Sequence, residues 1–485
     1  MTTASASNRR NSVLSTFRPA LAYLVSIALT KGLSLVTVPV FTHYLVPADF
    51  ARLEVFASLI EFIGLVAALG LADTLFRFAA SDGDSHGQAR VASGLFGAGL
   101  LTAAAISTAV LCGGETLKAG FGAGFSVLAF DSALIGAALT GVITLPLAWM
   151  RFSQRPMLFM GFTVARGLAQ TLLSVTVLSQ GYGVDGVVFG NAMIEFISAA
   201  ALIFWQFNST GISIDRNSLR RCGVYGLPLV GASLAMFAVG NLDRWFLVNY
   251  VEPDTLAEYA LALKLALATP LMIQPFLLWW YPLRLSWLRD ADGPARNARA
   301  AGRGFALLVA SGVFVCFAGA EFISLLLPSA YSGAAAFLPA IVFLCGLNEL
   351  SGFVNVGSYQ GDNGYRILAI NIAAAMIALI GYSVSIPHFG VWGAIASTAL
   401  AQAARVVFFI VAGSRSQAMP VPYGRMAILA AFAVIVVAFR PEVSNWWVIP
   451  LYGLGALLIC NLVAIVLGLF ALPTLRAGFS RWKTS

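Results

Sequence analysis

The sequence predicts an all-α integral membrane protein with about fourteen transmembrane helices, and three observations lead to that fold class. First, 59% of the 485 residues are hydrophobic and only 10% are charged, whereas a soluble domain carries about 25% charged residues. Second, the mean hydropathy is +0.85. Third, apolar runs of about 18 residues or more, long enough to cross a bilayer, recur along the whole chain.

These apolar runs define the expected spans. The polar, basic start of the chain is followed by a run of about 25 apolar residues, and because a signal-peptide core is only about 7–15 residues long, this run is expected to remain as the first span. The thirteenth run is the shortest. The expected spans are residues 20–44, 51–78, 92–111, 125–150, 157–178, 184–207, 225–251, 256–281, 306–327, 334–359, 368–386, 391–411, 426–439 and 446–470.

The distribution of basic residues predicts the orientation of these spans. If the N-terminus is cytoplasmic, the cytoplasmic loops hold nearly all of the basic residues, and the opposite side holds only Arg52, Lys118 and Arg440. Cytoplasmic loops of membrane proteins carry such an excess, so both termini are expected in the cytoplasm. Because the basic residues alternate by loop and form no basic aromatic patch, no nucleic-acid partner is expected.

An internal repeat divides the chain. Tyr44-Leu45-Val46-Pro47 resembles Tyr250-Val251-Glu252-Pro253 at an offset of 206 residues, and Gly183-Val184-Asp185-Gly186 resembles Gly390-Val391-Trp392-Gly393 at an offset of 207. Each pair occupies the same place in a six-span unit, so the two halves have the same orientation. Transporters built from such repeats bind their substrates between the halves.

The repeat predicts three parts. Residues 1–213 form an N-terminal six-helix lobe and residues 214–417 form a C-terminal six-helix lobe, pseudo-symmetric to the first around a central cavity. Residues 418–485 form an extra helix pair and a cytoplasmic tail.

Basic residues inside the predicted spans are candidates for a functional site. A charge at the centre of a membrane helix costs about 2.5–3.5 kcal/mol on insertion scales, so these residues must face protein, water or one another. Similar depths in the bilayer suggest four ion pairs. The expected pairs are Lys31 with Glu61, Arg166 with Glu195, Lys264 with Asp243, and Arg405 with Glu349.

Two interpretations of these charges stay open. They are either structural ion pairs that hold helices together or groups that line a hydrated central cavity. The second is favoured for Lys31, which is too deep to reach the membrane surface easily. It is also favoured for Arg244, whose only neighbour at its depth is the adjacent Asp243. Asp131, near the outer surface, either binds a cation or is simply hydrated.

Prolines inside the expected spans are predicted to kink their helices. A kink can act as a bending point in a carrier, and a plain packing role is an equal alternative. These residues are Pro39, Pro146, Pro228, Pro270, Pro275 and Pro339.

Several stretches of the sequence resemble bacterial polysaccharide and O-antigen flippases. The segment 45–50 followed by Leu69-Gly70-Leu71 and Phe76-Arg77-Phe78 is similar to the start of these proteins. Segments 225–228, 241–244, 258–260, 325–331 and 390–394 resemble their second half, so the resemblance covers about residues 15–415.

This Wzx-like family lies in the superfamily that includes MATE exporters and lipid II flippases. The resemblance implies two six-helix lobes around a central cavity in the bacterial inner membrane. It also implies translocation of a polyprenyl-diphosphate-linked oligosaccharide from the cytoplasmic to the periplasmic leaflet. Lipid II flippases carry an arginine cluster on the first span, and here Lys31 stands alone, which favours an O-antigen, capsule or exopolysaccharide unit as cargo.

The chemistry of such a substrate defines the candidate residues. A diphosphate needs buried cations to replace its lost hydration. The candidate substrate-binding cations are Lys31, Arg244, Lys264, Arg166, Arg405 and Arg77, and the candidate ion-coupling or pairing acids are Glu61, Asp131, Glu195, Asp243 and Glu349.

The remaining expectations concern activity and partners. The sequence has no GxxxxGK[ST] motif and no metal-ligand cluster, so no cofactor or metal is expected. The outer loops are too short to hold a catalytic site, so an enzyme is not expected. A MATE-like small-molecule exporter and a membrane enzyme such as a polymerase remain the alternatives. Expected partners are the lipid-linked oligosaccharide and membrane lipids, with a polysaccharide polymerase and chain-length machinery as further candidates.

Overall fold

The computed structural model contains helices as its only regular elements in the residues it describes. These are residues 25–26, 28–121, 124–288, 290–359, 364–416, 419–439 and 449–470. Within them, 10 helical segments are long and apolar enough to cross a membrane, and two shorter apolar helices lie near the C-terminal end. Residues 20–24 and 27 of the first expected span, the start of the last span, and Arg440 fall outside the described residues.

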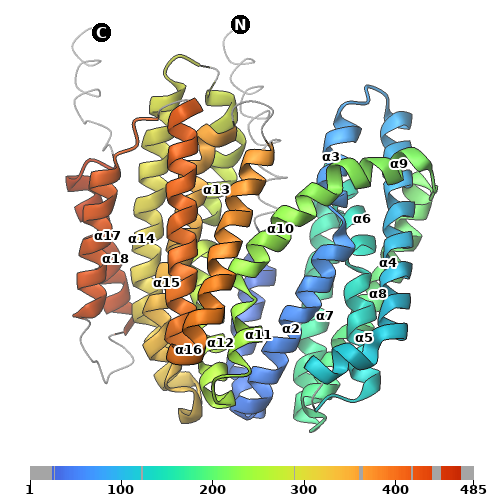
Figure 1. Cartoon of the computed structure of the whole chain (residues 1–485), viewed down its shortest axis with the longest axis horizontal. Coiled ribbons are helices and arrows are strands. Elements are labelled where there is room, and N and C mark those ends of the chain that lie inside the picture. Colours follow the sequence, from blue (N-terminus) through green and yellow to red (C-terminus); the bar gives the residue numbers. More distant parts are fainter. Residues whose placement is uncertain are drawn as a thin grey trace, which may run out of the picture. The chain divides into compact units, whose positions relative to one another are not determined.

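The chain divides into two compact units, one ending at Ala257 and the other beginning at Glu258. The first unit starts with a helix over residues 28–44. It continues with α2 (Pro47–Ala68), α3 (Leu71–Ala80), α4 (Ser85–Phe121), α5 (Val127–Ala138), α6 (Thr140–Phe152), α7 (Pro156–Ser179), α8 (Gly183–Thr210), α9 (Arg216–Arg221), the π-helix η1 (Cys222–Gly226), α10 (Leu227–Gly240) and α11 (Asp243–Leu247). Figure 1 shows these elements from blue to green.

The second unit holds the later helices, drawn from green to red in Figure 1. Helix α12 (Pro253–Ala266) crosses the boundary between the units. The other elements are α13 (Ala268–Trp287), α14 (Gly293–Leu326), η2 (Ser329–Tyr331), α15 (Ala334–Val354), η3 (Asn355–Tyr359), α16 (Gly364–Ser416), α17 (Tyr423–Ala438) and α18 (Ile449–Val466). Both α17 and α18 pack against α14. The predicted lobe boundary at residues 213 and 214 stays a prediction, and residues 214–257 pack with the first unit.

Large apolar side chains remain exposed on the helices. Phe204 is 72% exposed, Leu172 65% and Ile380 62%. A soluble protein rarely leaves extended apolar surface in water. Lipid is therefore the solvent that fits these helices, and the multi-pass membrane class predicted from composition is confirmed.

The second expected span is broken into two helices. Residues Leu69 and Gly70 have φ angles of 47° and 60°, and this left-handed pair ends α2 and starts α3. A Cβ atom on Gly70 would lie 2.9 Å from the carbonyl oxygen of Gly226, so only glycine lets α3 approach η1 this closely.

Irregular helix geometry occurs beside two of the prolines and also away from them. The turn at Leu267 between α12 and α13 lies three residues before Pro270, and η1 ends two residues before Pro228. Pro146, Pro275 and Pro339 lie inside α6, α13 and α15. The chain also leaves α-helical geometry between α10 and α11, at Asn241. Proline removes one backbone hydrogen bond, and neighbouring helices can hold the segment helical around it.

The two copies of the glycine motif, at residues 183–186 and 390–393, have matching backbone roles. Gly183 and Gly390 have φ angles of 60° and 53°, each just before the sixth span of its half. A Cβ atom on Gly186 would overlap Val177, and one on Gly393 would overlap the carbonyl oxygen of Ser385. In each motif the first glycine therefore makes the turn, and the fourth residue allows the following helix to pack closely.

A short extended segment connects α8 to α9 and lies on α4. Ser213 donates its backbone N–H to the carbonyl of Ser93 at 3.2 Å, and the two hydroxyl groups are 2.7 Å apart. Gly94 and Gly97 leave room for this segment, because a Cβ atom at either position would overlap it. The Asp215 carboxylate then caps α9 by accepting from the Ser218 backbone N–H at 2.8 Å and from its hydroxyl at 2.7 Å.

Replacing Gly97 with alanine should displace the connecting segment from α4. The added methyl group meets the Ser213 carbonyl, and overpacking of this kind costs about 1–3 kcal/mol. Thermal unfolding of the purified protein in detergent measures the loss. Gly113→Ala on the same helix is the matched control, because no atom lies within 4 Å of its added Cβ. Equal melting temperatures for the two variants would contradict this packing.

The amides of α9 should stay protected from hydrogen exchange at a lower pH than they would if Asp215 had the usual pKa of an aspartate. The hydrogen bonds from the Ser218 side chain and backbone hold the pKa of Asp215 below its usual value of 3.8. The cap is therefore complete above that value and is lost only as the pH falls through the lowered pKa. The protection factors of the amides of residues 216–221, which are corrected for the intrinsic exchange rate at each pH, should keep their neutral-pH values down to pH 3.8 in the wild type. Asp215→Ala, which loses about 1 kcal/mol of capping, should exchange faster at every pH.

Candidate functional site

Three charged candidates from separate helices interact in the first unit. Glu61 on α2 interacts electrostatically with Arg244 on α11 and then with Lys31 on the first helix. The Lys31 and Glu61 side chains are exposed and Arg244 is half-buried. The proximity expected for Lys31 and Glu61 is thus supported, and Arg244 joins them although the sequence suggested no partner for it beyond Asp243.

Arg244 keeps unused hydrogen-bond donors. Its Nη1 donates to Asn241 Oδ1 at 3.4 Å, whereas its Nε is buried and has no hydrogen-bond partner among the described residues. The neighbouring carboxylate of Asp243 accepts from the backbone N–H of Arg244 at 2.9 Å. An orphaned charged donor in a low-dielectric region is costly, so this side chain is suited to hold an anion.

An aromatic cluster holds α11 in place beside α2. Trp245 donates its indole N–H to the Ser58 hydroxyl at 2.7 Å. Its ring lies 5.6 Å from Phe62 and 4.8 Å from Phe121, both in edge-to-face geometry. These contacts fix the short helix that carries Arg244.

A second cluster joins α7 and α8. Arg166 forms an ion pair with Glu195, and Gln170 donates to the same carboxylate oxygen at 2.8 Å. One turn further along, Ser174 donates to Asn191 at 3.3 Å. The predicted Arg166–Glu195 pair is therefore confirmed, and it joins α7 to α8. The Nε of Arg166 is buried and has no hydrogen-bond partner among the described residues.

A third cluster in the second unit centres on Arg405. Its guanidinium donates to the side-chain oxygens of Asn371 and Asn348, both at 3.0 Å, and of Gln402 at 3.2 Å. Glu349 interacts electrostatically with Arg405 and hydrogen bonds to Asn348. The expected Arg405–Glu349 proximity is supported, but amide oxygens are central to this cluster.

Glu349 also faces an open space. A cavity of about 300 Å³ lies between α13 and α15 and is lined by Gln274, Leu277, Leu278, Tyr281, Pro282 and Glu349. Its carboxylate, amide and phenol groups can bind water or a polar ligand.

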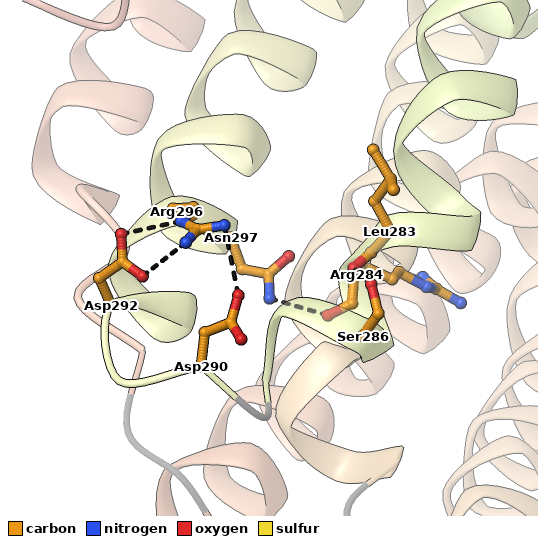
Figure 2. A network of polar contacts seen from close by, with 7 residues as sticks. All are labelled: Leu283, Arg284, Ser286, Asp290, Asp292, Arg296 and Asn297. Carbon is orange, nitrogen blue, oxygen red and sulfur yellow. Dashed lines mark hydrogen bonds and ion pairs between the residues drawn. The ribbon is translucent and has the colours of Figure 1, made fainter. Parts of the chain in front are cut away.

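The α13–α14 junction is fixed by a polar network (Figure 2). Arg296 donates twice to Asp292 at 2.8 Å and lies 3.3 Å from Asp290. The hydrogen bonds with Arg296 hold the pKa of the Asp292 carboxyl below its usual range. The buried Asn297 donates to the carbonyl of Arg284 at 2.9 Å, so the end of α13 is bound to the start of α14.

Arg284 extends this network to α15. Its guanidinium donates to the carbonyl of Gly352 at 3.1 Å and to Asn355 Oδ1 at 3.2 Å, and it lies 4.2 Å from the ring centre of Tyr281. Three helices are thereby joined at one end of the unit. Sequence reasoning treated Arg284 only as a charge that sets orientation and missed this role.

The other candidates are dispersed. Lys264 is half-buried on α12 in the second unit, and its pairing with Asp243 in the first unit stays a prediction. Asp131 on α5 makes no hydrogen bond or ion pair within the described chain. Arg77 lies at the end of α3, over the ring of Tyr225.

Some amide side chains were expected in another role, and others were missed. The sequence suggests Asn241 and Asn348 as partners for sugar hydroxyl groups, but in the structure they accept hydrogen bonds from Arg244 and Arg405. Gln402 and Gln170 were missed, and each lies one helical turn from an arginine, because Gln402 is three residues before Arg405 and Gln170 is four after Arg166. An asparagine or glutamine one turn from a mid-membrane arginine is the signal that could have identified them.

Comparison with known proteins identifies the family. The profile of a family described as polysaccharide biosynthesis protein matches residues 17–285, more than half of the chain. The chain belongs to this family. No curated protein sequence matches this polysaccharide biosynthesis protein.

Solved structures share the fold of this family member. The lipid II flippase MurJ in an inward closed conformation has a TM-score of 0.68 at 10% identity, and the match covers 93% of this chain and 98% of that one. An inward-facing MATE multidrug resistance transporter has a TM-score of 0.54 at 16% identity, with 82% and 95% covered. An outward-facing structure of such a transporter has a TM-score of 0.53 at 17% identity, with 81% and 94% covered. The polysaccharide biosynthesis protein therefore has the fold of this transporter superfamily.

Removing one acceptor of Arg405 should destabilise the second unit. Asn371→Leu leaves the Nε of Arg405 without its acceptor, and an unmet buried hydrogen bond costs about 1–3 kcal/mol. Thermal unfolding in lipid nanodiscs measures the change. Ser383→Ala, at an exposed position of the same helix, should stay within about 0.5 kcal/mol of the wild type. An unchanged melting temperature for Asn371→Leu would show that the stability of the second unit does not depend on this hydrogen bond.

Proposed function

We propose that this family member is a carrier that moves a polyprenyl-diphosphate-linked oligosaccharide across the inner membrane, from the cytoplasmic to the periplasmic leaflet. The cargo would be an O-antigen, capsule or exopolysaccharide unit. Both termini would lie in the cytoplasm, as the distribution of basic residues predicts. The protein would catalyse no covalent step, because translocation moves the cargo without breaking a bond.

The observation that carries this proposal is the arrangement around Arg244. A guanidinium with a buried, unpartnered Nε lies in electrostatic contact with Glu61, and Lys31 shares that carboxylate. A diphosphate oxygen would supply the acceptor that Arg244 lacks and would form charge-assisted hydrogen bonds with it. The exposed Lys31 would add a second cation that needs little rearrangement to reach a ligand.

An apolar groove in the second unit supports a prenylated cargo. The groove has a volume of about 610 Å³ and lies between α13, α14, α15 and α17, within the range of about 300–1,000 Å³ found for ligand sites. Thr269 is the one hydroxyl residue of its lining, and Thr269 Oγ1 is buried without a hydrogen-bond partner among the described residues. Such a surface suits a hydrocarbon chain and does not suit a sugar.

Alternating access would complete the cycle. Structures with the same fold are described as inward-facing and outward-facing, and we propose that this chain exchanges between comparable states. The breaks at Leu69–Gly70 and at Asn241 are local points where backbone dihedrals can change without unfolding a whole helix. An ion gradient or the membrane potential would drive the exchange.

Gene deletion followed by extraction of lipid-linked sugars tests the proposed function. Surface polysaccharide should be lost while the lipid-linked unit accumulates on the cytoplasmic leaflet. Lys31→Ala, Arg244→Ala and Lys264→Ala should each fail to restore export at wild-type levels of membrane insertion, and Lys118→Ala should restore it. Full export by all three variants would refute the site. Unchanged surface polymer with loss of resistance to small cationic compounds would instead support a drug exporter.

Filling the apolar groove should block export without affecting insertion. Gly346 lines the groove and has no atom within 4 Å of an added Cβ, so Gly346→Phe places a ring in the open space. We expect surface polymer to fall at least about tenfold, because tenfold corresponds to only about 1.4 kcal/mol of lost tail binding. Gly455→Phe on α18 is the matched control, because this position is equally open and lies outside the groove. Wild-type export by Gly346→Phe would exclude the groove as a site for the tail.

A further inference from the structure

Two arginines and two aromatic rings form reciprocal pairs at one end of the first unit. Arg77 on α3 lies over the ring of Tyr225 in η1, at 4.7 Å from its centre. Arg221 at the end of α9 lies over the ring of Phe78 on α3, at 4.8 Å. The rings of Phe78 and Tyr225 meet edge to face at 5.9 Å. Helix α3 therefore contributes one cation and one ring, α9 contributes the second cation, and η1 contributes the second ring.

The backbone approach of α3 and η1 creates this arrangement. Gly70 and Gly226 pack against each other without side chains, and a Cβ atom on either would collide with the opposite backbone. Figure 1 shows α3 and α9 at the same end of the first unit. The contact brings together residues that are far apart in the sequence and fixes both rings beneath the guanidinium groups.

The polar groups of this cluster remain available. Within the described chain, the guanidinium groups of Arg77 and Arg221 and the hydroxyl of Tyr225 make no hydrogen bond or ion pair. Asp73, one turn before Arg77, does not pair with it. Asp215 interacts electrostatically with Arg221, but its carboxylate is occupied by the cap on Ser218.

Stacking on a ring orients a guanidinium without using its N–H groups. The planar fork keeps its donors free at the edge, and this fork matches the oxygens of a phosphate. Arginines that only interact with water or with the average charge of the membrane do not need such positioning. Both pairs lie at the face that the positive-inside rule assigns to the cytoplasm.

We propose that Arg77, Arg221 and Tyr225 form a binding site for the phosphate groups of a membrane lipid at this face. Two lipids carry the required chemistry there. One is the polyprenyl diphosphate carrier, in which case the site is where the cargo first docks and the inference rests on the proposed function. The other is an anionic phospholipid of the bilayer, in which case the site anchors α3 and α9 to the leaflet.

Binding to the full-length protein in detergent tests the site and separates the two lipids. The probes are farnesyl diphosphate, short-chain phosphatidylglycerol and, as a neutral reference, farnesol. The double variant R77Q/R221Q should weaken binding of one phosphate probe by about tenfold or more, since charge-assisted hydrogen bonds are lost. Loss for farnesyl diphosphate identifies the carrier, and loss for phosphatidylglycerol identifies the bilayer lipid.

A matched control distinguishes binding by the ring-supported arginines from nonspecific attraction of a phosphate to basic residues on the surface. R216Q/R220Q removes two exposed arginines of α9 that make no ring contact within the described chain, and it should change the affinity by less than about twofold. F78L/Y225L keeps the charges but removes the rings, and it should weaken binding by about threefold or more. Equal losses in R77Q/R221Q and R216Q/R220Q, or no phosphate-dependent binding in the wild type, would overturn the site. Because the readout is binding, a failure of export alone would count against the carrier and not against this site.

Discussion

A guanidinium group within the membrane needs several acceptors, and the helices of this protein are arranged around that need. Arg405 receives three amide oxygens from α15 and α16, and Arg166 shares the Glu195 carboxylate with Gln170. Water cannot replace these partners cheaply in a low-dielectric region. The amide groups supply acceptors in addition to the carboxylates, and these contacts join neighbouring helices.

Several arginines keep donors that have no hydrogen-bond partner in the described chain. Arg166 and Arg244 each have a buried, unpaired Nε, and the second lies beside Glu61. Arg77 and Arg221 are oriented by aromatic rings, which leave their N–H groups free. Each of these side chains can gain hydrogen bonds when an anion arrives. In the predicted topology, Arg244 lies deeper in the bilayer than Arg77 and Arg221, which lie near the cytoplasmic face. A phosphate that first met the ring-supported pair and then Arg244 would encounter cations at both stages of its entry.

The polar cluster around Arg244 and the apolar groove lie in different units of the protein. The Arg244 cluster belongs to the first unit, and the apolar groove of about 610 Å³ belongs to the second. The helices that line the groove include α17, one of the two helices outside the sequence repeat. Ala430, Ala433, Val434, Val437 and Ala438 of this helix close one side of the groove.

Composition and periodicity determined the membrane class, the approximate spans and the repeat, because a bilayer imposes a length and a polarity on every helix. The depth of charged residues in the spans also predicted Arg166–Glu195, since residues at one level on adjacent helices can meet. Tertiary structure decided what depth cannot specify, namely which faces of the helices point at each other. It placed Arg244 beside Glu61, gave Arg405 its amide acceptors, and added helix breaks at Leu69–Gly70 and Asn241, where no proline predicts one. Close backbone packing, as at Gly70 and Gly226, depends on contacts between residues far apart in the chain, and no local sequence signal encodes it.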